Sequence, residues 1–278
     1  MQTLSFHETH RYVYPDTPSG ANTALTVCEI GNDPALAFLT QSAFADEITY
    51  LHLGVDETIA ESSPPAGRQV ISGMAYNPIS KTIWCSSATN ADAGEVFAFV
   101  PATSQEVLSV DVTAGSNLAF PAGCATNGLL LVRGYREILE LRTMSGVKIA
   151  EKTYPGRRIY GVSASPWSWV FGDLGSNEIV VIDPFGRIVA TAPAPGSATP
   201  PSTADGPIPA AGLQAIAFDY VSNLDAHPQV WLDGGTIGDP GTIHHPDTPW
   251  NPTPWGFRHR LYVANQTDQI IYAGYLTP

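Results

Sequence analysis

Proline-marked turns recur along this chain at a nearly constant spacing. They lie at Pro34, Pro78, Pro121 and Pro166, so successive turns are 44, 43 and 45 residues apart. Between them, short segments rich in β-branched and aromatic residues alternate with clusters of Gly, Asn, Asp, Ser and Pro. A fixed period in the forties that contains several short strands is typical of a β-propeller blade. The spacing therefore predicts an all-β fold built as a ring of small sheets.

One interval shows the expected blade most clearly. Its four apolar segments, 71–76, 82–86, 95–100 and 107–112, are separated by turn-forming residues and predict a four-stranded antiparallel meander. In the following interval, the last two segments alternate charged and apolar side chains. We expect one face of these strands to pack on a neighbouring blade and the charged face, which includes Glu140, to meet water.

The number of blades is open between five and six. Leu213–Asp219 begins a final unit, and Arg260–Asn265 and Gln269–Tyr275 resemble the second and third strands of the other units. We prefer five blades because no separate Gly/Ala-rich opening strand precedes these two segments, and six is the alternative. The last unit lacks one strand, which Leu4–Glu8 or His10–Tyr14 can supply. Pairing an N-terminal strand into the last blade would close the ring and remove two open edges.

The chain is long for a single hydrophobic core, yet a ring of blades can extend as one domain because each blade contacts mainly its neighbours. We therefore expect residues 1–278 to form a single propeller domain. Pro/Gly-rich loops interrupt its rhythm at 196–211 and 223–257. If the protein has a specific activity, these interruptions are the first places to look.

Two stretches resemble a known class of repeat. The run Gly175–Pro184, followed by Gly186–Thr191, resembles YVTN and NHL-type propeller repeats. Leu261–Asn265 is similar to the tetrapeptide signature, with Ala264 in place of threonine. The resemblance covers about three to four repeats and implies the fold alone. Such families include scaffolds, substrate-binding proteins and some enzymes, so the resemblance transfers no catalytic residue.

Charge excludes two classes of partner. The 26 acidic and 13 basic residues give a net charge of −13. The densest basic groups, Arg157–Arg158 and Arg258–Arg260, are isolated, and we interpret them as solvated strand ends. Binding to nucleic acid or to an anionic membrane requires clustered Lys and Arg. We therefore expect neither partner.

The first eight residues lack a basic segment followed by an apolar stretch, and no segment reaches the ~18 apolar residues that span a bilayer. We expect no secretory signal and no transmembrane span. The expected location is the cytoplasm at synthesis, with incorporation into a virion or surface assembly left open. Cys28, Cys85 and Cys124 occupy similar phases of three repeats, which suits small buried residues better than disulfides.

The segment 223–257 and the residues after it depart most from blade geometry. Trp250, Trp255 and Phe257 are rigid side chains in a proline-rich segment, and they are candidates for binding a sugar or a protein partner. The alternative is that these aromatic side chains fold back over the apolar end of the ring. A glycan-binding lectin is therefore one alternative function.

Candidate metal ligands also lie in this region. Imidazole and carboxylate groups can hold a transition metal, and four residues could contribute them. An ordered Pro/Trp loop is the competing interpretation, because no established ligand spacing is present, and we expect no cofactor. The four candidates are His244, His245, Asp247 and His259.

Near the N-terminus, His7 and His10 superficially resemble a metal-binding pair. If they lie on one regular strand, an odd separation places them on opposite faces. We therefore expect structural roles for both.

A metal-dependent, lactonase-like hydrolase is a second alternative function. Such a propeller would place carboxylate and amide ligands around its central channel, and Glu29, Asn117, Asp173 and Asp219 are conceivable members. The sequence contains no Gly-rich phosphate loop, no GxSxG elbow and no Cys/His nucleophile arrangement. This favours a non-enzymatic role over an enzymatic one.

The first functional prediction is a binding or assembly module. Only 14% of residues are charged, against about 25% in an average soluble protein, so the surface is lightly charged. Together with the long loops, this predicts a propeller that binds a protein partner or a larger assembly, such as a surface or virion complex in which it is a structural subunit.

Overall fold

The structure of the chain is a computed structural model. It describes residues 1–13, 24–31, 33–41, 46–53, 58–68, 71–90, 93–101, 103–112, 116–120, 128–133, 137–164, 169–183, 185–197, 213–218, 260–265 and 267–277. All regular secondary structure in these ranges is β-strand. None of the described residues belongs to a helix that could cross a membrane.

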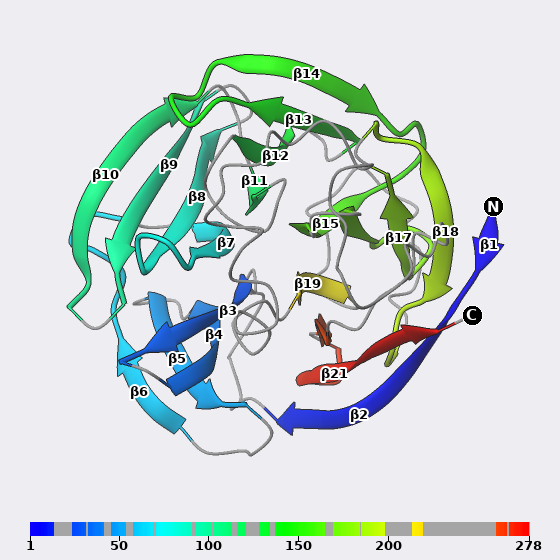
Figure 1. Cartoon of the computed structure of the whole chain (residues 1–278), viewed down its shortest axis with the longest axis horizontal. Helices are drawn as coiled ribbons and strands as arrows, with labels where there is room; N and C mark the ends of the chain where they lie inside the picture. The colour runs from blue at the N-terminus through cyan, green and yellow to red at the C-terminus, as the bar shows by residue number, and fades with distance from the viewer. Residues whose placement is uncertain are drawn as a thin grey trace, which may run out of the picture.

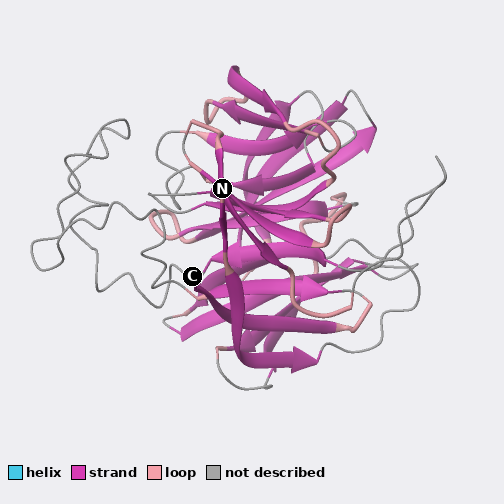
Figure 2. Cartoon of the chain, turned by 90° about the vertical axis from the view of Figure 1, so that its right-hand side faces the viewer, coloured by secondary structure: helices cyan, strands magenta, loops and turns pink. Residues whose placement is uncertain are grey.

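Five antiparallel sheets form a ring, each with its first strand nearest the centre (Figure 1). Seen from the side, the strands run between the two faces of the ring (Figure 2).

Blade 1 contains β3 (Leu25–Ile30), β4 (Asp33–Gln41), β5 (Asp46–His52) and β6 (Thr58–Ser62). Blade 2 contains β7 (Ile71–Asn77), β8 (Thr82–Asn90), β9 (Ala93–Val100) and β10 (Gln105–Val112). Blade 3 contains β11 (Ser116–Ala119), β12 (Leu129–Arg133), β13 (Ile138–Arg142) and β14 (Lys148–Thr153). Blade 4 contains β15 (Ile159–Ala164), β16 (Trp169–Asp173), β17 (Glu178–Ile182) and β18 (Ile188–Pro193). Blade 5 contains β19 (Leu213–Phe218), β20 (Leu261–Asn265), β21 (Ile270–Thr277) and β2 (Ser5–Val13). The five-bladed propeller predicted from the repeat is thus confirmed.

The N-terminal segment closes the ring. Strand β2 pairs antiparallel with β21, from Ser5 opposite Thr277 to Val13 opposite Ile270, and it overlaps both segments that were predicted for this role. Strand β1 (Gln2–Thr3) adds a fifth strand to blade 4 by pairing in parallel with β18. The extension was not predicted, and it means that one short segment holds two blades together. That residues 1–278 form a single domain with insertions at 196–211 and 223–257 stays a prediction, because nearly all of both insertions lies outside the described residues.

The blades repeat not only their strands but also their irregularities. Four inner strands carry a register shift at the same place in their pairing with the second strand, and a β-bulge of this kind increases local twist. In β15 the extra residue is Gly161, with a φ of 65°. A Cβ atom there would lie 2.6 Å from the backbone nitrogen of Ile216 in blade 5, so the close approach of the two blades requires glycine. The shifts fall at Ile71/Gly73, Ser116/Leu118, Tyr160/Val162 and Leu213/Ala215.

A similar shift in β2 corrects the prediction for the two N-terminal histidines. His7 lies opposite Tyr275 and His10 lies opposite Ala273, with the bulge between Glu8 and His10. Because Tyr275 and Ala273 are two residues apart on β21, they share a face of the sheet, and so do His7 and His10. The simple count of alternating positions failed because the bulge inserts one extra residue.

Apolar side chains fill the spaces between neighbouring blades. The fully buried side chains include Tyr12, Phe38, Phe97 and Phe171. Cys28 and Cys85 are buried free thiols, as predicted, and burial raises the pKa of both. Cys124 lies outside the described residues.

The expectation for Glu140 was wrong. Its side chain is completely buried, not exposed to water, and its Oε2 accepts a hydrogen bond of 2.7 Å from Nε of Arg142. Arg142, two residues along the same strand, is also buried and donates to the carbonyl oxygen of Gly146. Two opposite charges on one face of β13 thus neutralise each other, which allows the blade to bury them.

Candidate functional site

A narrow channel lies on the axis of the ring, where the inner strands of all five blades meet. Its cavity is about 30 Å³, which is room for about two water molecules. Most of the lining residues are apolar, and Met74, Phe120 and Phe218 contribute large side chains. The three side-chain hydroxyls in the lining, those of Thr26, Tyr76 and Ser163, all take part in hydrogen bonds between blades. The lining observed in the described residues therefore suits blade packing better than catalysis.

Two of these hydroxyls, those of Thr26 and Ser163, join neighbouring blades in the same way. Thr26 Oγ1 accepts a hydrogen bond of 3.0 Å from the backbone N–H of Tyr76 in the next blade. Ser163 Oγ accepts one of the same length from the N–H of Phe218. Each joins the inner strand of one blade to the inner strand of the next, so both stabilise the ring.

Replacing Thr26 by valine is expected to destabilise the protein by about 1–3 kcal/mol, because the buried N–H of Tyr76 loses its acceptor. Thr103→Val is the matched control, since Thr103 Oγ1 accepts a bond from the N–H of Gln105 in an exposed turn. That variant should change stability by less than about 0.5 kcal/mol. Urea unfolding monitored by tryptophan fluorescence would measure both. Equal losses in the two variants would show that the channel hydroxyl has no special role.

Glu29, a candidate ligand in the lactonase-like interpretation, lies at the end of β3. Its Oε2 accepts a hydrogen bond of 3.2 Å from the hydroxyl of Tyr76 and forms an ion pair of 3.3 Å with Lys81 Nζ. Burial, followed by the nearby Glu29 carboxylate, raises the pKa of Tyr76, so this hydroxyl stays protonated and acts as a donor. The carboxylate is thereby tied to the turn between β7 and β8 in the neighbouring blade.

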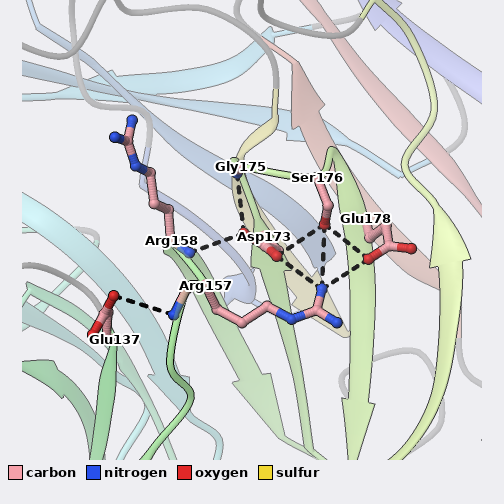
Figure 3. Close-up of polar contacts among 8 residues, drawn as sticks. Glu137, Arg157, Arg158, Asp173, Gly175, Ser176 and Glu178 are labelled. Carbon is pink, nitrogen blue, oxygen red and sulfur yellow. Dashed lines mark hydrogen bonds and ion pairs between the residues drawn. The ribbon is translucent and has the colours of Figure 1, made fainter. Parts of the chain in front are cut away.

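Asp173 is the centre of a second polar network, at the turn between β16 and β17 (Figure 3). Its Oδ1 accepts bonds from the backbone N–H groups of Arg158, at 2.9 Å, and Gly175, at 3.0 Å. Its Oδ2 lies 2.8 Å from Nη1 of Arg157, and the same nitrogen lies 2.8 Å from Oε2 of Glu178. Only 2% of the Asp173 side chain is exposed. The network ties the turn to residues 157–158, which lead from blade 3 into blade 4.

Blade 5 uses an amide for the same purpose. Asn265, at the end of β20, donates from Nδ2 to the carbonyl oxygens of Pro195 and Ser197, both at 3.1 Å. These residues follow β18 and lead towards the first strand of blade 5. Asp173 and Asn265 therefore occupy equivalent positions and both stabilise the connection between successive blades.

The structure separates the described candidate ligands. Glu29 lies near the end of an inner strand, and Asp173 is the last residue of a second strand. Because neighbouring strands are antiparallel, these positions lie on opposite faces of the ring. They cannot contact one ion. Within the described ranges, no group of three or more His, Cys, Asp and Glu side chains could hold a metal.

The remaining predicted site residues cannot be placed. Asp219, the aromatic candidates and the metal candidates lie outside the described residues, and the side chain of Asn117 is not described. The predictions that concern them are untested. The aromatic candidates are Trp250, Trp255 and Phe257, and the metal candidates are His244, His245, Asp247 and His259.

Exposed apolar side chains gather on the outer strands of blades 2 and 3. Val107 and Leu108 on β10 are 52% and 39% exposed, and Val147 and Ile149 at β14 are 63% and 55% exposed. The two strands lie at the rim of neighbouring blades (Figure 1). The turn before β14 contacts β10, because a Cβ atom on Gly146 in this turn would lie 2.9 Å from Val110 Cγ1 of β10. We call Val107, Leu108, Val147 and Ile149 the rim patch.

Comparison with known proteins supports the fold. The sequence matches no family model and no curated protein. Among solved structures, the glutaminyl cyclase of Myxococcus xanthus is similar to this chain, with a TM-score of 0.61 and 12% sequence identity. The alignment covers 99% of this chain and 97% of the cyclase. At this identity the likeness extends to the fold alone.

Two further solved structures resemble the chain more weakly. The alignment with BamB from Moraxella catarrhalis covers 95% of this chain and 62% of BamB, with 11% identity and a TM-score of 0.37. The alignment with a chain of a mitotic checkpoint complex covers 92% of this chain and 64% of that one, with 10% identity and a TM-score of 0.44. Scores this low carry no argument about function. The resemblance to YVTN and NHL-type repeats stays a prediction.

Proposed function

We propose that this protein is a binding or assembly module that holds a protein partner at the rim patch. The observation that carries the proposal is the presence of four large exposed apolar side chains on β10 and at the start of β14, the outer strands of neighbouring blades. Patches of this kind on a folded protein mark interaction sites. A propeller suits such a role because its rim presents rigid outer strands at fixed positions around the ring.

Charge beside the patch indicates the chemistry of the partner. The chain has only three lysines, and two of them, Lys148 and Lys152, lie on β14. Lys148 forms an ion pair of 2.9 Å with Glu151, whereas Lys152 has no carboxylate partner within the described structure. The complementary surface is therefore apolar at its centre and carries carboxylates at its edge.

A charge placed in the patch tests the proposal. The full chain is purified with any partner that accompanies it, and its assembly state is measured by sedimentation velocity over a range of concentrations. Val107→Glu and Ile149→Glu are expected to weaken the association by at least about tenfold, because each buries a carboxylate in an apolar contact. Both side chains are exposed, so folding is preserved.

Ile79→Glu is the matched control, since Ile79 is 58% exposed but lies in the turn between β7 and β8, outside the patch. It should leave the association unchanged. A wild-type chain that stays monomeric at high concentration with no accompanying partner would contradict the proposal. So would equal dissociation by all three variants.

The more specific functions predicted from the sequence can each be tested separately. A structural role in a surface or virion complex is supported by the lightly charged surface and the long insertions, and detection of the chain within such a particle would test it. Glycan binding depends on Trp250 and Trp255, so an array without binding would remove it. A metal-dependent hydrolase requires bound metal, which elemental analysis of the native protein would reveal. The likeness to a glutaminyl cyclase makes the fold compatible with catalysis and does not indicate a reaction.

A further inference from the structure

The side of blade 5 that faces blade 1 carries a cluster of basic and hydroxyl side chains. Tyr262 and His10 lie opposite the same small residue, Ala273, on neighbouring strands and therefore on one face of the sheet. Next to them, the guanidinium of Arg260 lies over the ring of Tyr275, 6.0 Å from its centroid. The bulge in β2 adds His7 to the same face, opposite Tyr275. We call His7, His10, Arg260, Tyr262 and Tyr275 the blade 5 cluster.

Arg260 differs from the other cations of the described structure. It is half-buried and contacts no carboxylate there. Burial lowers its pKa, but the neighbouring hydroxyls of Tyr262 and Tyr275 outweigh this and raise the pKa, so the guanidinium is always charged. Arg158 and Lys152 also lack an ion pair, but both are exposed to water. The cations paired with a carboxylate are Arg11, Arg68, Lys81, Arg142, Lys148, Arg157 and Arg187.

Two buried nitrogen atoms of the cluster have no hydrogen-bond partner, His10 Nε2 and Arg260 Nε. The described carboxylates of blade 5 are engaged elsewhere. Glu8 pairs with Arg11 at 2.7 Å, and Asp268 accepts bonds from the hydroxyl of Tyr272 and the backbone N–H of Ser197, both at 2.8 Å. Buried polar atoms in folded proteins are nearly always hydrogen-bonded. Two neighbouring buried nitrogen atoms without a partner therefore indicate that a ligand group is missing from this position.

A carboxylate fits these donors. The planar guanidinium presents parallel N–H groups to the two oxygens of a carboxylate, and an imidazole N–H can donate to the same group. The net charge of −13 repels a doubly charged anion more strongly than a singly charged one. We propose that the blade 5 cluster is a binding site for the carboxylate group of a small-molecule ligand, separate from the rim patch.

Acetate is the simplest probe of this site. The full chain is titrated with sodium acetate at constant ionic strength, held with sodium chloride, while NMR follows the Arg260 Nε–Hε resonance and the His10 ring resonances. Saturable shifts of both are expected. Arg260→Gln should raise the dissociation constant of acetate by at least about tenfold, measured from the His10 resonances. His10→Gln should also raise it, measured from the Arg260 resonance. Arg158→Gln, which removes an exposed guanidinium in blade 4, should leave it unchanged.

Each other outcome would overturn the proposal. A shift that grows linearly without saturation, or that chloride reproduces, would indicate general screening. Inorganic phosphate binding more tightly than acetate would show that the assigned ligand class is wrong. Should Arg260→Gln prevent folding, His10→Gln still decides the question, because the proposal fails if acetate binds that variant as tightly as it binds the wild type. The rim variants do not touch blade 5, so failure here leaves the proposed function standing.

Discussion

Replacing Tyr12 by alanine is expected to lower the free energy of unfolding by about 3–5 kcal/mol, the range measured for large aromatic residues in protein cores. Tyr12 is completely buried, and it belongs to β2, the strand that closes the ring. Its ring lies 6.2 Å from that of Tyr262 in the same blade and packs in the same core cluster as Phe38 of blade 1. Loss of the ring therefore opens a cavity where the first and last blades meet.

Val13→Ala provides the control, because Val13 is the next residue of the same strand but is 64% exposed. Its effect should stay within about 0.5 kcal/mol. Urea unfolding followed by both circular dichroism and fluorescence would give the two values and show whether unfolding remains cooperative. A Tyr12→Ala loss no larger than that of Val13→Ala would show that the closing strand contributes little to stability.

Asp173→Ala is expected to cost about 2–4 kcal/mol. The substitution leaves the backbone N–H groups of Arg158 and Gly175 without their acceptor and removes one of the two carboxylates that contact Arg157. Asp173→Asn should cost less, since the amide oxygen can still accept from the two N–H groups while the charge is lost. Thermal unfolding by calorimetry would rank the three proteins.

Asp183→Ala is the matched control for the Asp173 variants. Asp183 also accepts from two backbone N–H groups, those of Phe185 and Arg187, but both lie within its own turn. Its loss should cost about 1 kcal/mol, as for an ordinary hydrogen-bonded turn. If Asp173→Ala and Asp183→Ala were equally harmful, a link between blades would add nothing beyond turn formation.

Much of the fold could be predicted because the repeat is regular. Evenly spaced turns fixed the blade period, and the missing strand of the final unit indicated that an N-terminal segment must close the ring. Strand β1 could not be predicted, because Gln2 and Thr3 are too few to show alternation. The bulge at Thr9 could not be predicted either, because His7, Glu8 and Thr9 are all polar and exposed and give no alternation in which an extra residue can be noticed.

Site residues were harder to predict for a different reason. Arg260 was interpreted as part of a solvated strand end, because its sequence neighbours Arg258 and His259 are also basic. Its surroundings depend on β21 and on β2, and β2 lies at the other end of the sequence. The burial of Glu140 was not predicted because the alternation of charged and apolar residues does not show that Arg142, two residues later on the same face, would pair with it.

Ring closure by β2 has a consequence for the order of folding during synthesis. Thr9 Oγ1 donates to the carbonyl oxygen of Ala273, 264 positions away, so β2, which is made early, pairs with β21, the last strand described. Blades 1 to 4 can form their sheets as they leave the ribosome, whereas residues 5–13 must wait unpaired until β21 has been synthesised. Until then, the nascent chain exposes the aromatic side chain of Tyr12 and an open edge, and chaperones would meet the protein in this state.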